Sequence, residues 1–302
     1  IVRLNGPLVP GGGIFGFTIS PDGTHVAYLA TQDAVGIAEL YVVPIAGGEA
    51  LKVSGPMVAN GSVAQFIWSP DSAELVYLAD QVTDGTFELF VSRRDGSSNV
   101  RVSGPLVAGG QVFEFVWSPD SSRIAYLAQQ FTAGVSEVFS SRRDGSVNVR
   151  VSGPMTASGD AVFGIAWAPD SSRVAYRADQ ITNGRFELFT SRADGTGNVR
   201  VSGPLAAGGS VFDLTWAPDG SRIAYRADQF SDDIVELYTS RPDGTGNTQV
   251  SALLAGGNRD VFDYAWAPDS SRIAYRADQD TDDVLEVYTS GPEGTANVRV
   301  SG

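Results

Sequence analysis

The chain has 302 residues, of which 42% are hydrophobic, with no cysteine, one histidine (His25) and one lysine (Lys52). This composition excludes disulfides, cysteine nucleophiles and zinc sites built from several histidines. The formal net charge of −14 argues against nucleic acid as a partner, because phosphate binding requires a basic surface. Because no apolar run approaches the roughly 20 residues of a membrane-spanning helix, no membrane insertion is expected.

A repeat of 49 or 50 residues fills the chain. Its clearest marker is a Pro-Asp pair, and the steps between successive pairs are 49, 49, 50, 49 and 50 residues. Repeats of this length indicate solenoids, propellers or arrays. The prolines of the six pairs are Pro21, Pro70, Pro119, Pro169, Pro218 and Pro268.

Each copy contains four short segments that alternate apolar and polar residues or are rich in β-branched and aromatic residues. In the third copy they span 112–117, 123–128, 136–141 and 148–152, and the connections between them are rich in Gly, Pro, Asp and Ser. These are strand and turn signals. Six copies of four strands predict an all-β fold, a six-bladed β-propeller with four-stranded antiparallel blades, as one domain over 1–302. An open β-solenoid is the alternative, although its repeats are shorter.

The outermost strand of each blade raises a question of ring closure, because its motif occurs seven times. Six blades need six such strands, so we expect one terminal copy, 1–5 or 297–301, to close the ring. The surplus suggests that the chain was cut from a longer repeat array. The seven copies lie at 1–5, 51–54, 99–103, 148–152, 198–202, 248–251 and 297–301.

Three segments carry a family resemblance: WSPDSSRIAYLA (117–128), ELYVVPIAGGEALKV (39–53) and ELFVSRRDGSSNVRV (88–102). This pattern resembles the TolB-like, WD-type β-propeller repeat, as in TolB and the propeller domains of prolyl oligopeptidase-type enzymes. The resemblance covers all six copies and implies the fold. It implies little about function, because propellers serve as binding platforms in unrelated systems. The acidic composition, almost without lysine, favours a periplasmic or extracellular location.

The connection between the second and third strand of each copy is predicted to be a hairpin, and all six hairpins are expected on one face. Every copy has a glutamine in this hairpin and a glutamate in the following strand, which indicates a structural role for both. Aspartates vary, from none in the third copy to four in the sixth. The hairpins span 31–36, 80–85, 129–134, 179–184, 228–233 and 278–283.

The sixth hairpin is the candidate metal site, because alternating carboxylates in a short polar loop are typical of Ca²⁺ binding. Asp278, Asp280, Asp282 and Asp283 are the candidate ligands. The alternative is a solvated acidic turn, since aspartate is common in turns. The glycine and the bidentate glutamate of an EF-hand loop are not at their positions.

The first strand of each blade is expected to line the central channel. Its aligned polar residues could bind a cation or a polar ligand, or they could only be solvated. In the last three copies an arginine stands two residues before an aspartate, and Arg177, Arg226 and Arg276 are expected to pair with these aspartates. The candidate channel residues are Gln65, Glu114, Asp213, Asp260 and Asp263.

No constellation of nucleophile, base and orienting acid is recognisable, so the sequence predicts a protein that is not an enzyme. The predicted function is a binding scaffold for a protein, a peptide or a glycan through the hairpin face. One loop position carries apolar residues in four copies: Val82, Phe131, Ile181 and Phe230. Two alternatives stay open: a metal-dependent hydrolase or lyase with a carboxylate site at the channel mouth, and a structural repeat-array unit.

Overall fold

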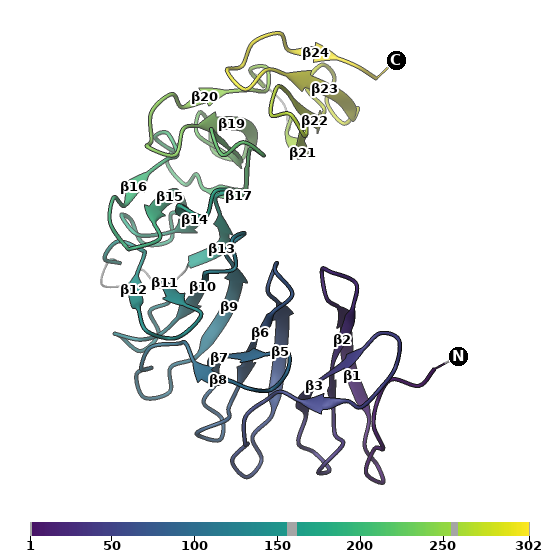
Figure 1. Cartoon of the computed structure of the whole chain (residues 1–302). Coiled ribbons are helices and arrows are strands. Elements are labelled where there is room, and N and C mark those ends of the chain that lie inside the picture. The colour runs from purple at the N-terminus through teal and green to yellow at the C-terminus, as the bar shows by residue number, and fades with distance from the viewer. Residues whose placement is uncertain (1, 156–161, 255–258, 302) are drawn as a thin grey trace. The chain divides into compact units, whose positions relative to one another are not determined.

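The computed structural model describes residues 2–155, 162–254 and 259–301. These residues form 24 strands, arranged as six antiparallel sheets of four strands each (Figure 1). In each sheet the strands follow one another in chain order, so each repeat builds one blade. The fold is an all-β six-bladed propeller, as the repeat predicted.

Residue contacts divide the chain into two compact units. Unit 1 comprises Ile1–Gly134 and Phe139–Val149, and unit 2 comprises Val135–Val138 and Arg150–Gly302. Blades 1 and 2 and most of blade 3 belong to unit 1, and blades 4 to 6 belong to unit 2. The prediction of a single domain stays a prediction. No helix among the described residues is long and apolar enough to cross a bilayer.

The blades of the first three repeats have closely similar strand bounds. Blade 1 contains β1 (Ile14–Ile19), β2 (His25–Ala30), β3 (Glu39–Pro44) and β4 (Leu51–Lys52). Blade 2 contains β5 (Val63–Trp68), β6 (Glu74–Ala79), β7 (Glu88–Arg93) and β8 (Asn99–Arg101). Blade 3 contains β9 (Val112–Trp117), β10 (Arg123–Ala128), β11 (Glu137–Arg142) and β12 (Asn148–Arg150).

The same order continues through the last three repeats. Blade 4 contains β13 (Val162–Trp167), β14 (Arg173–Ala178), β15 (Glu187–Arg192) and β16 (Val199–Arg200). Blade 5 contains β17 (Val211–Trp216), β18 (Ile223–Ala227), β19 (Glu236–Ser240) and β20 (Thr248–Gln249). Blade 6 contains β21 (Val261–Trp266), β22 (Ile273–Ala277), β23 (Glu286–Ser290) and β24 (Val298–Arg299).

In blades 1 to 5 the two middle strands are buried on both sides over most of their length, which explains their nearly continuous apolar sequence. In blade 2, every residue of β6 is buried, and Tyr77 stacks on Phe90 of β7 with ring centroids 5.6 Å apart. Equivalent stacked pairs occur in all six blades. The apolar core therefore lies within and between the blades.

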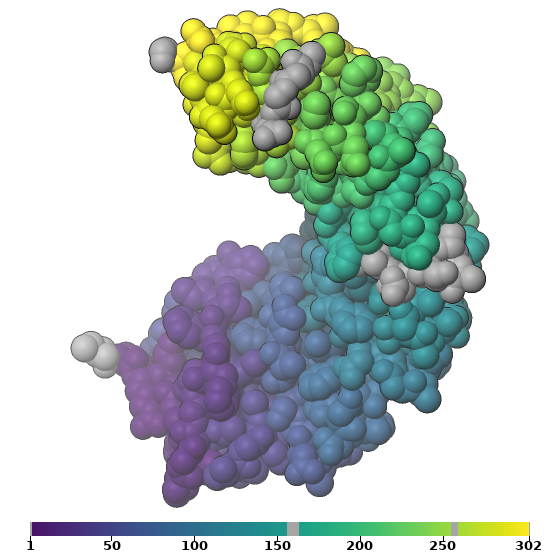
Figure 2. Space-filling view, turned by 180° about the vertical axis from the view of Figure 1, so that it is seen from behind, coloured from purple at the N-terminus to yellow at the C-terminus, as the bar shows by residue number. Residues whose placement is uncertain are grey.

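The tryptophan at the end of the first strand joins neighbouring blades. Trp68 is buried, and its Nε1 donates a hydrogen bond to the carbonyl oxygen of Thr18 in the preceding blade. Trp117, Trp216 and Trp266 donate in the same way to the blade before them. Four of the tryptophans thus join neighbouring blades. Within each unit the blades pack into a continuous surface (Figure 2).

The two terminal copies of the outer-strand motif differ in structure. The C-terminal copy pairs with β23, where Tyr288 is opposite Arg299, and so completes blade 6. Ile1 of the N-terminal copy lies outside the described residues. Leu4 and Leu8 pack against the cluster that contains Val26 and Tyr28 in blade 1. The N-terminal segment therefore belongs to the blade 1 core, although no strand is formed between residues 2 and 13.

Candidate functional site

Within each unit, the hairpin face consists of the hairpins and of the linkers that lead into the first strands. Backbone hydrogen bonds join the two parts within a blade: the N–H of Gln129 donates to the Gln111 carbonyl, and that of Asp278 to the Asp260 carbonyl. The hairpin and linker of these blades therefore lie side by side, as expected from the propeller topology. In blades 2, 5 and 6 the aspartate that begins the hairpin strengthens this connection.

This aspartate has the same structural role in several blades. In blade 2, Asp80 Oδ1 accepts the N–H of Ser62 at 2.6 Å, and Oδ2 accepts that of Gly85 at 2.9 Å. In blade 6, the oxygens of Asp278 accept the N–H of Asp260 at 2.6 Å and that of Asp283 at 3.2 Å. A buried carboxylate is thereby satisfied by backbone donors of the linker and of its own hairpin.

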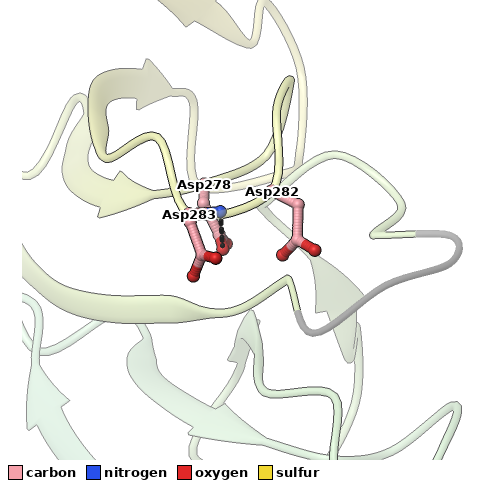
Figure 3. A group of neighbouring side chains, drawn as sticks. All are labelled: Asp278, Asp282 and Asp283. Atoms are coloured by element: carbon pink, nitrogen blue, oxygen red, sulfur yellow. Dashed lines mark hydrogen bonds between the residues drawn. The ribbon is translucent and has the colours of Figure 1, made fainter.

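Three of the four predicted metal ligands lie together. Carboxylate oxygens of Asp278, Asp282 and Asp283 are within 4.8 Å of one another, and Asp278 is buried whereas the other two are exposed (Figure 3). Asp280 lies apart from this group, with its Oδ2 3.5 Å from Nη1 of Arg299 on the outer strand. The calcium site stays a prediction, and the distances between the carboxylate oxygens leave three of the four aspartates as candidate ligands.

The glutamates after the hairpins have the structural role that the sequence indicated. Glu187 is buried, and its Oε1 accepts a hydrogen bond of 2.8 Å from Arg200 on the outer strand of the same blade. Equivalent contacts join Glu88 to Arg101 and Glu137 to Arg150. The hairpin glutamines also bind within the blade: the Tyr77 hydroxyl donates to Gln81 Oε1 at 2.6 Å.

The predicted channel carboxylates of blades 5 and 6 are neutralised by arginines. Asp213 Oδ2 lies 2.6 Å from Nη2 of Arg226, and Asp263 Oδ2 lies 2.7 Å from Nη2 of Arg276. Each pair sits directly opposite in the antiparallel register of the first and second strands. The expected pairings of Arg226 with Asp228 and of Arg276 with Asp278 were therefore wrong, because residues facing each other across strands approach more closely than residues two apart.

Glu114 and Gln65 occupy the same register position in blades 3 and 2, where the residues opposite are Leu127 and Leu78. Asp260 is not a strand residue, and its Oδ1 accepts the N–H of Val235 at 2.7 Å. Burial, together with the charge of Asp278, raises the pKa of the Asp260 carboxyl. The five channel candidates are thus distributed over four blades, with Asp260 and Asp263 both in blade 6, and none of them belongs to the group of three carboxylates found among the described residues.

The four apolar hairpin residues have exposed side chains. Their exposed fractions are 54% for Val82, 62% for Phe131, 54% for Ile181 and 75% for Phe230. In blades 1 and 6 the same loop position is Asp33 or Asp280, which contacts Lys52 or Arg299 of the outer strand. The Phe131 ring lies 5.7 Å from that of Phe139 on β11. This row therefore lies toward the outer strands of the hairpin face.

A second row of exposed aromatic side chains was missed by the sequence analysis. Phe113 of β9 is 51% exposed, whereas Phe115, two residues later, is buried. Strict alternation would place both on the same side, but the register shifts between Val112 and Glu114, so Phe113 is the extra residue of a β-bulge. The available signal was its recurrence at one repeat position as Phe15, Phe113, Phe163, Phe212 and Phe262.

Comparison with known proteins gives structural neighbours only. No family model matches the chain, and no curated protein matches it by sequence. Dipeptidyl peptidase 4 of Porphyromonas gingivalis is 16% identical with a TM-score of 0.63, over 95% of this chain and 46% of the peptidase. This likeness supports a β-propeller fold for the chain. A putative TolB from Agrobacterium tumefaciens aligns over 95% of this propeller and 79% of its own chain, with 17% identity and a TM-score of 0.44.

An oligogalacturonate lyase in complex with manganese is 15% identical to this propeller, with a TM-score of 0.52, over 94% of this chain and 75% of the lyase. These neighbours correct the prediction that the chain is not an enzyme: the same fold occurs in a lyase and in peptidases, so the missing triad is no argument against catalysis. At such identities the likeness shows the fold alone. The chain also spans less than half of the peptidase.

Proposed function

We propose that this propeller is a recognition module of the periplasm or the extracellular space that binds a partner through its hairpin face. The observation that carries the proposal is the repeated exposure of large apolar side chains on that face. Single exposed apolar residues are normal on a protein surface, whereas a set that recurs at one position of successive blades points to an interaction site.

The neighbouring enzymes are consistent with this proposal, since a bound partner can also be a substrate. A metal centre formed by the channel carboxylates has less support, because Asp213 and Asp263 each form an ion pair with an arginine. Recognition by the hairpin face requires no such centre, and it applies equally to a scaffold and to the substrate-binding part of an enzyme.

The test is binding to arrays of immobilised glycans and peptides. The variant with Ile181→Ser and Phe230→Ser removes two exposed apolar side chains of unit 2 without touching the described core. Ile45→Ser is the matched control, because Ile45 is also exposed but follows β3 at the opposite end of blade 1, where its N–H donates to the Thr24 carbonyl.

We expect the double variant to bind at least about tenfold more weakly to the glycan or peptide that captures the unmodified protein, which corresponds to roughly 1.4 kcal/mol. The Ile45→Ser control should bind like the unmodified protein, and all three proteins should have similar melting temperatures. The proposal would be contradicted if the double variant bound as tightly as the unmodified protein, or if the unmodified protein bound nothing on either array.

A further inference from the structure

We propose that blades 4 to 6 present a subsite for a neutral glycan. It is formed by an aromatic ledge, which we define as Phe163, Phe212 and Phe262 together with Arg177 and Arg226. The inference rests on the proposed function, in that it takes the hairpin face to be the recognition face. It adds a second row of contacts and the chemical class of the ligand.

Each arginine of the ledge holds the backbone of the next blade. Arg177 Nη1 on β14 donates to the carbonyl oxygens of Val211, at 3.1 Å, and of Phe212. Arg226 Nη1 on β18 donates in the same way to the carbonyl oxygens of Val261, at 3.1 Å, and of Phe262. Two successive phenylalanines are therefore fixed through their own main chain by the blade before them.

A β-bulge explains why the rings of Phe212 and Phe262 are exposed. In blade 5 the strand register shifts between Val211, which is opposite Ala227, and Asp213, which is opposite Arg226. Phe212 is the inserted residue, and its side chain is 41% exposed, as is that of Phe262 at the equivalent bulge in blade 6. Bulges re-aim side chains, and a rigid backbone reduces the entropy lost when a ligand binds.

The polar groups beside the rings suit a ligand rich in hydroxyl groups. Asp213 supplies carboxylate acceptors and is 37% exposed, and Arg276 supplies guanidinium donors and is 47% exposed. The guanidinium of Arg276 in turn lies 6.0 Å from the centre of the Phe262 ring. A flat apolar surface flanked by paired donors and acceptors matches a sugar ring, which has an apolar C–H face and a rim of hydroxyls.

Charge selects the neutral class of glycan. The Asp213–Arg226 pair has no net charge, Arg177 adds a single positive charge, and the chain as a whole carries −14, so a polyanion such as polygalacturonate would be repelled by the protein. The ledge is also interrupted by polar groups, unlike the continuous apolar core of a protein–protein interface. An uncharged, extended saccharide is the ligand that fits both properties.

The experiment is isothermal titration calorimetry of the protein with cellohexaose, xylohexaose and mannohexaose, and with hexagalacturonate as the anionic comparison. The variant F212L/F262L keeps apolar side chains but removes the flat rings. F113L is its matched control, because Phe113 occupies the same bulge in blade 3, where Leu127 stands at the position of the arginine. The second ledge variant, F212Y/F262Y, retains the aromatic rings. It shows whether substitution at these two positions abolishes binding merely through misfolding.

We expect at least one neutral hexasaccharide to bind, F212L/F262L to weaken it by about tenfold or more, and F113L and F212Y/F262Y to change it less than about threefold. Binding of none of the neutral saccharides, unchanged binding by F212L/F262L, or tighter binding of hexagalacturonate would each overturn the inference. A ligand that is lost in the Ile181→Ser, Phe230→Ser variant but not in F212L/F262L would overturn the ledge alone and leave the proposed function standing.

Discussion

At the scale of the residue, the buried strand glutamates depend on one cation each. The Glu187 side chain is only 4% exposed, and of its two oxygens only Oε1 has a hydrogen-bond partner among the described residues. Arg200 supplies that bond from the rim of the blade, where its own side chain is 39% exposed. Removing the cation would therefore leave a buried charge without compensation.

We expect Arg200→Met to lower the free energy of unfolding by about 2 kcal/mol, because burying an unpaired carboxylate is costly while the methionine retains the apolar stem. Urea unfolding monitored by tryptophan fluorescence measures this change. Arg241→Met is the control: its contact with Glu293 is 3.9 Å long and exposed on both sides, so we expect a loss below about 0.5 kcal/mol. Equal effects of the two substitutions would refute the assigned role.

At the scale of the element, the first and second strands carry facing residue pairs whose chemistry differs between blades. Glutamine stands opposite leucine in blade 2, at Gln65 and Leu78, and aspartate stands opposite arginine in blade 5, at Asp213 and Arg226. The repeat therefore accommodates an uncharged pair in blade 2 and an ion pair in blade 5, while blade 3 has a carboxylate, Glu114, opposite Leu127.

A double-mutant cycle tests this pairing. Arg226→Leu alone should destabilise the protein by about 2 kcal/mol, since it isolates Asp213 and removes the donor to the Val261 and Phe262 carbonyls. Adding Asp213→Gln, which reproduces the pair of blade 2, should recover about 1 kcal/mol in urea unfolding. Additive effects of the two substitutions would show that the residues are not coupled.

The sixth hairpin supports a prediction about calcium. If Asp278, Asp282 and Asp283 hold Ca²⁺, millimolar Ca²⁺ should raise Tm relative to EDTA, and Asp282→Asn should abolish the increase. Asp280→Asn is the matched control, because Asp280 contacts Arg299 and lies outside the group. A Tm that is identical in Ca²⁺ and EDTA would remove the site from consideration.

At the scale of the whole molecule, two sets of carboxyl groups respond to acid in opposite directions. The hydroxyl and then the backbone N–H of the residue two positions later hold the pKa of several turn aspartates below the usual value. These are Asp95, Asp144, Asp194, Asp243 and Asp269. Burial raises the pKa of Glu74, Glu137, Asp228 and Asp260.

The two sets predict a stability maximum in mildly acidic solution. Groups with a raised pKa cost stability when ionised, so their protonation below neutral pH stabilises the fold and also reduces the net charge. Groups with a lowered pKa contribute stability above their unfolded pKa of about 3.9 and lose it as the pH falls further. We expect the urea concentration at the unfolding midpoint to be highest at about pH 5 and to decrease once the pH is lower than about 4. A midpoint that rises steadily down to pH 3 would contradict this balance.

The sequence predicted the fold because each level of its pattern agrees: the repeat length, the strand alternation and the turn residues. It was less informative about the site. Phe113 follows the alternation rule in the sequence and breaks it in the structure, because a bulge is not visible in residue type. Likewise, the Asp213–Arg226 pair depends on register, and the two residues are 13 positions apart.

The tryptophan bonds between blades have a consequence for how such a chain acquires its structure. Trp68 and Thr18 are 50 residues apart, and so are Trp117 and Ile67. A contact between neighbouring blades always spans one repeat. The loop that must close is therefore equally long for the later and the earlier blades of a unit. Each folded blade can therefore provide the surface on which the next blade folds, and the entropic cost of loop closure is the same for every blade. Duplication of a whole repeat would leave that folding step unchanged.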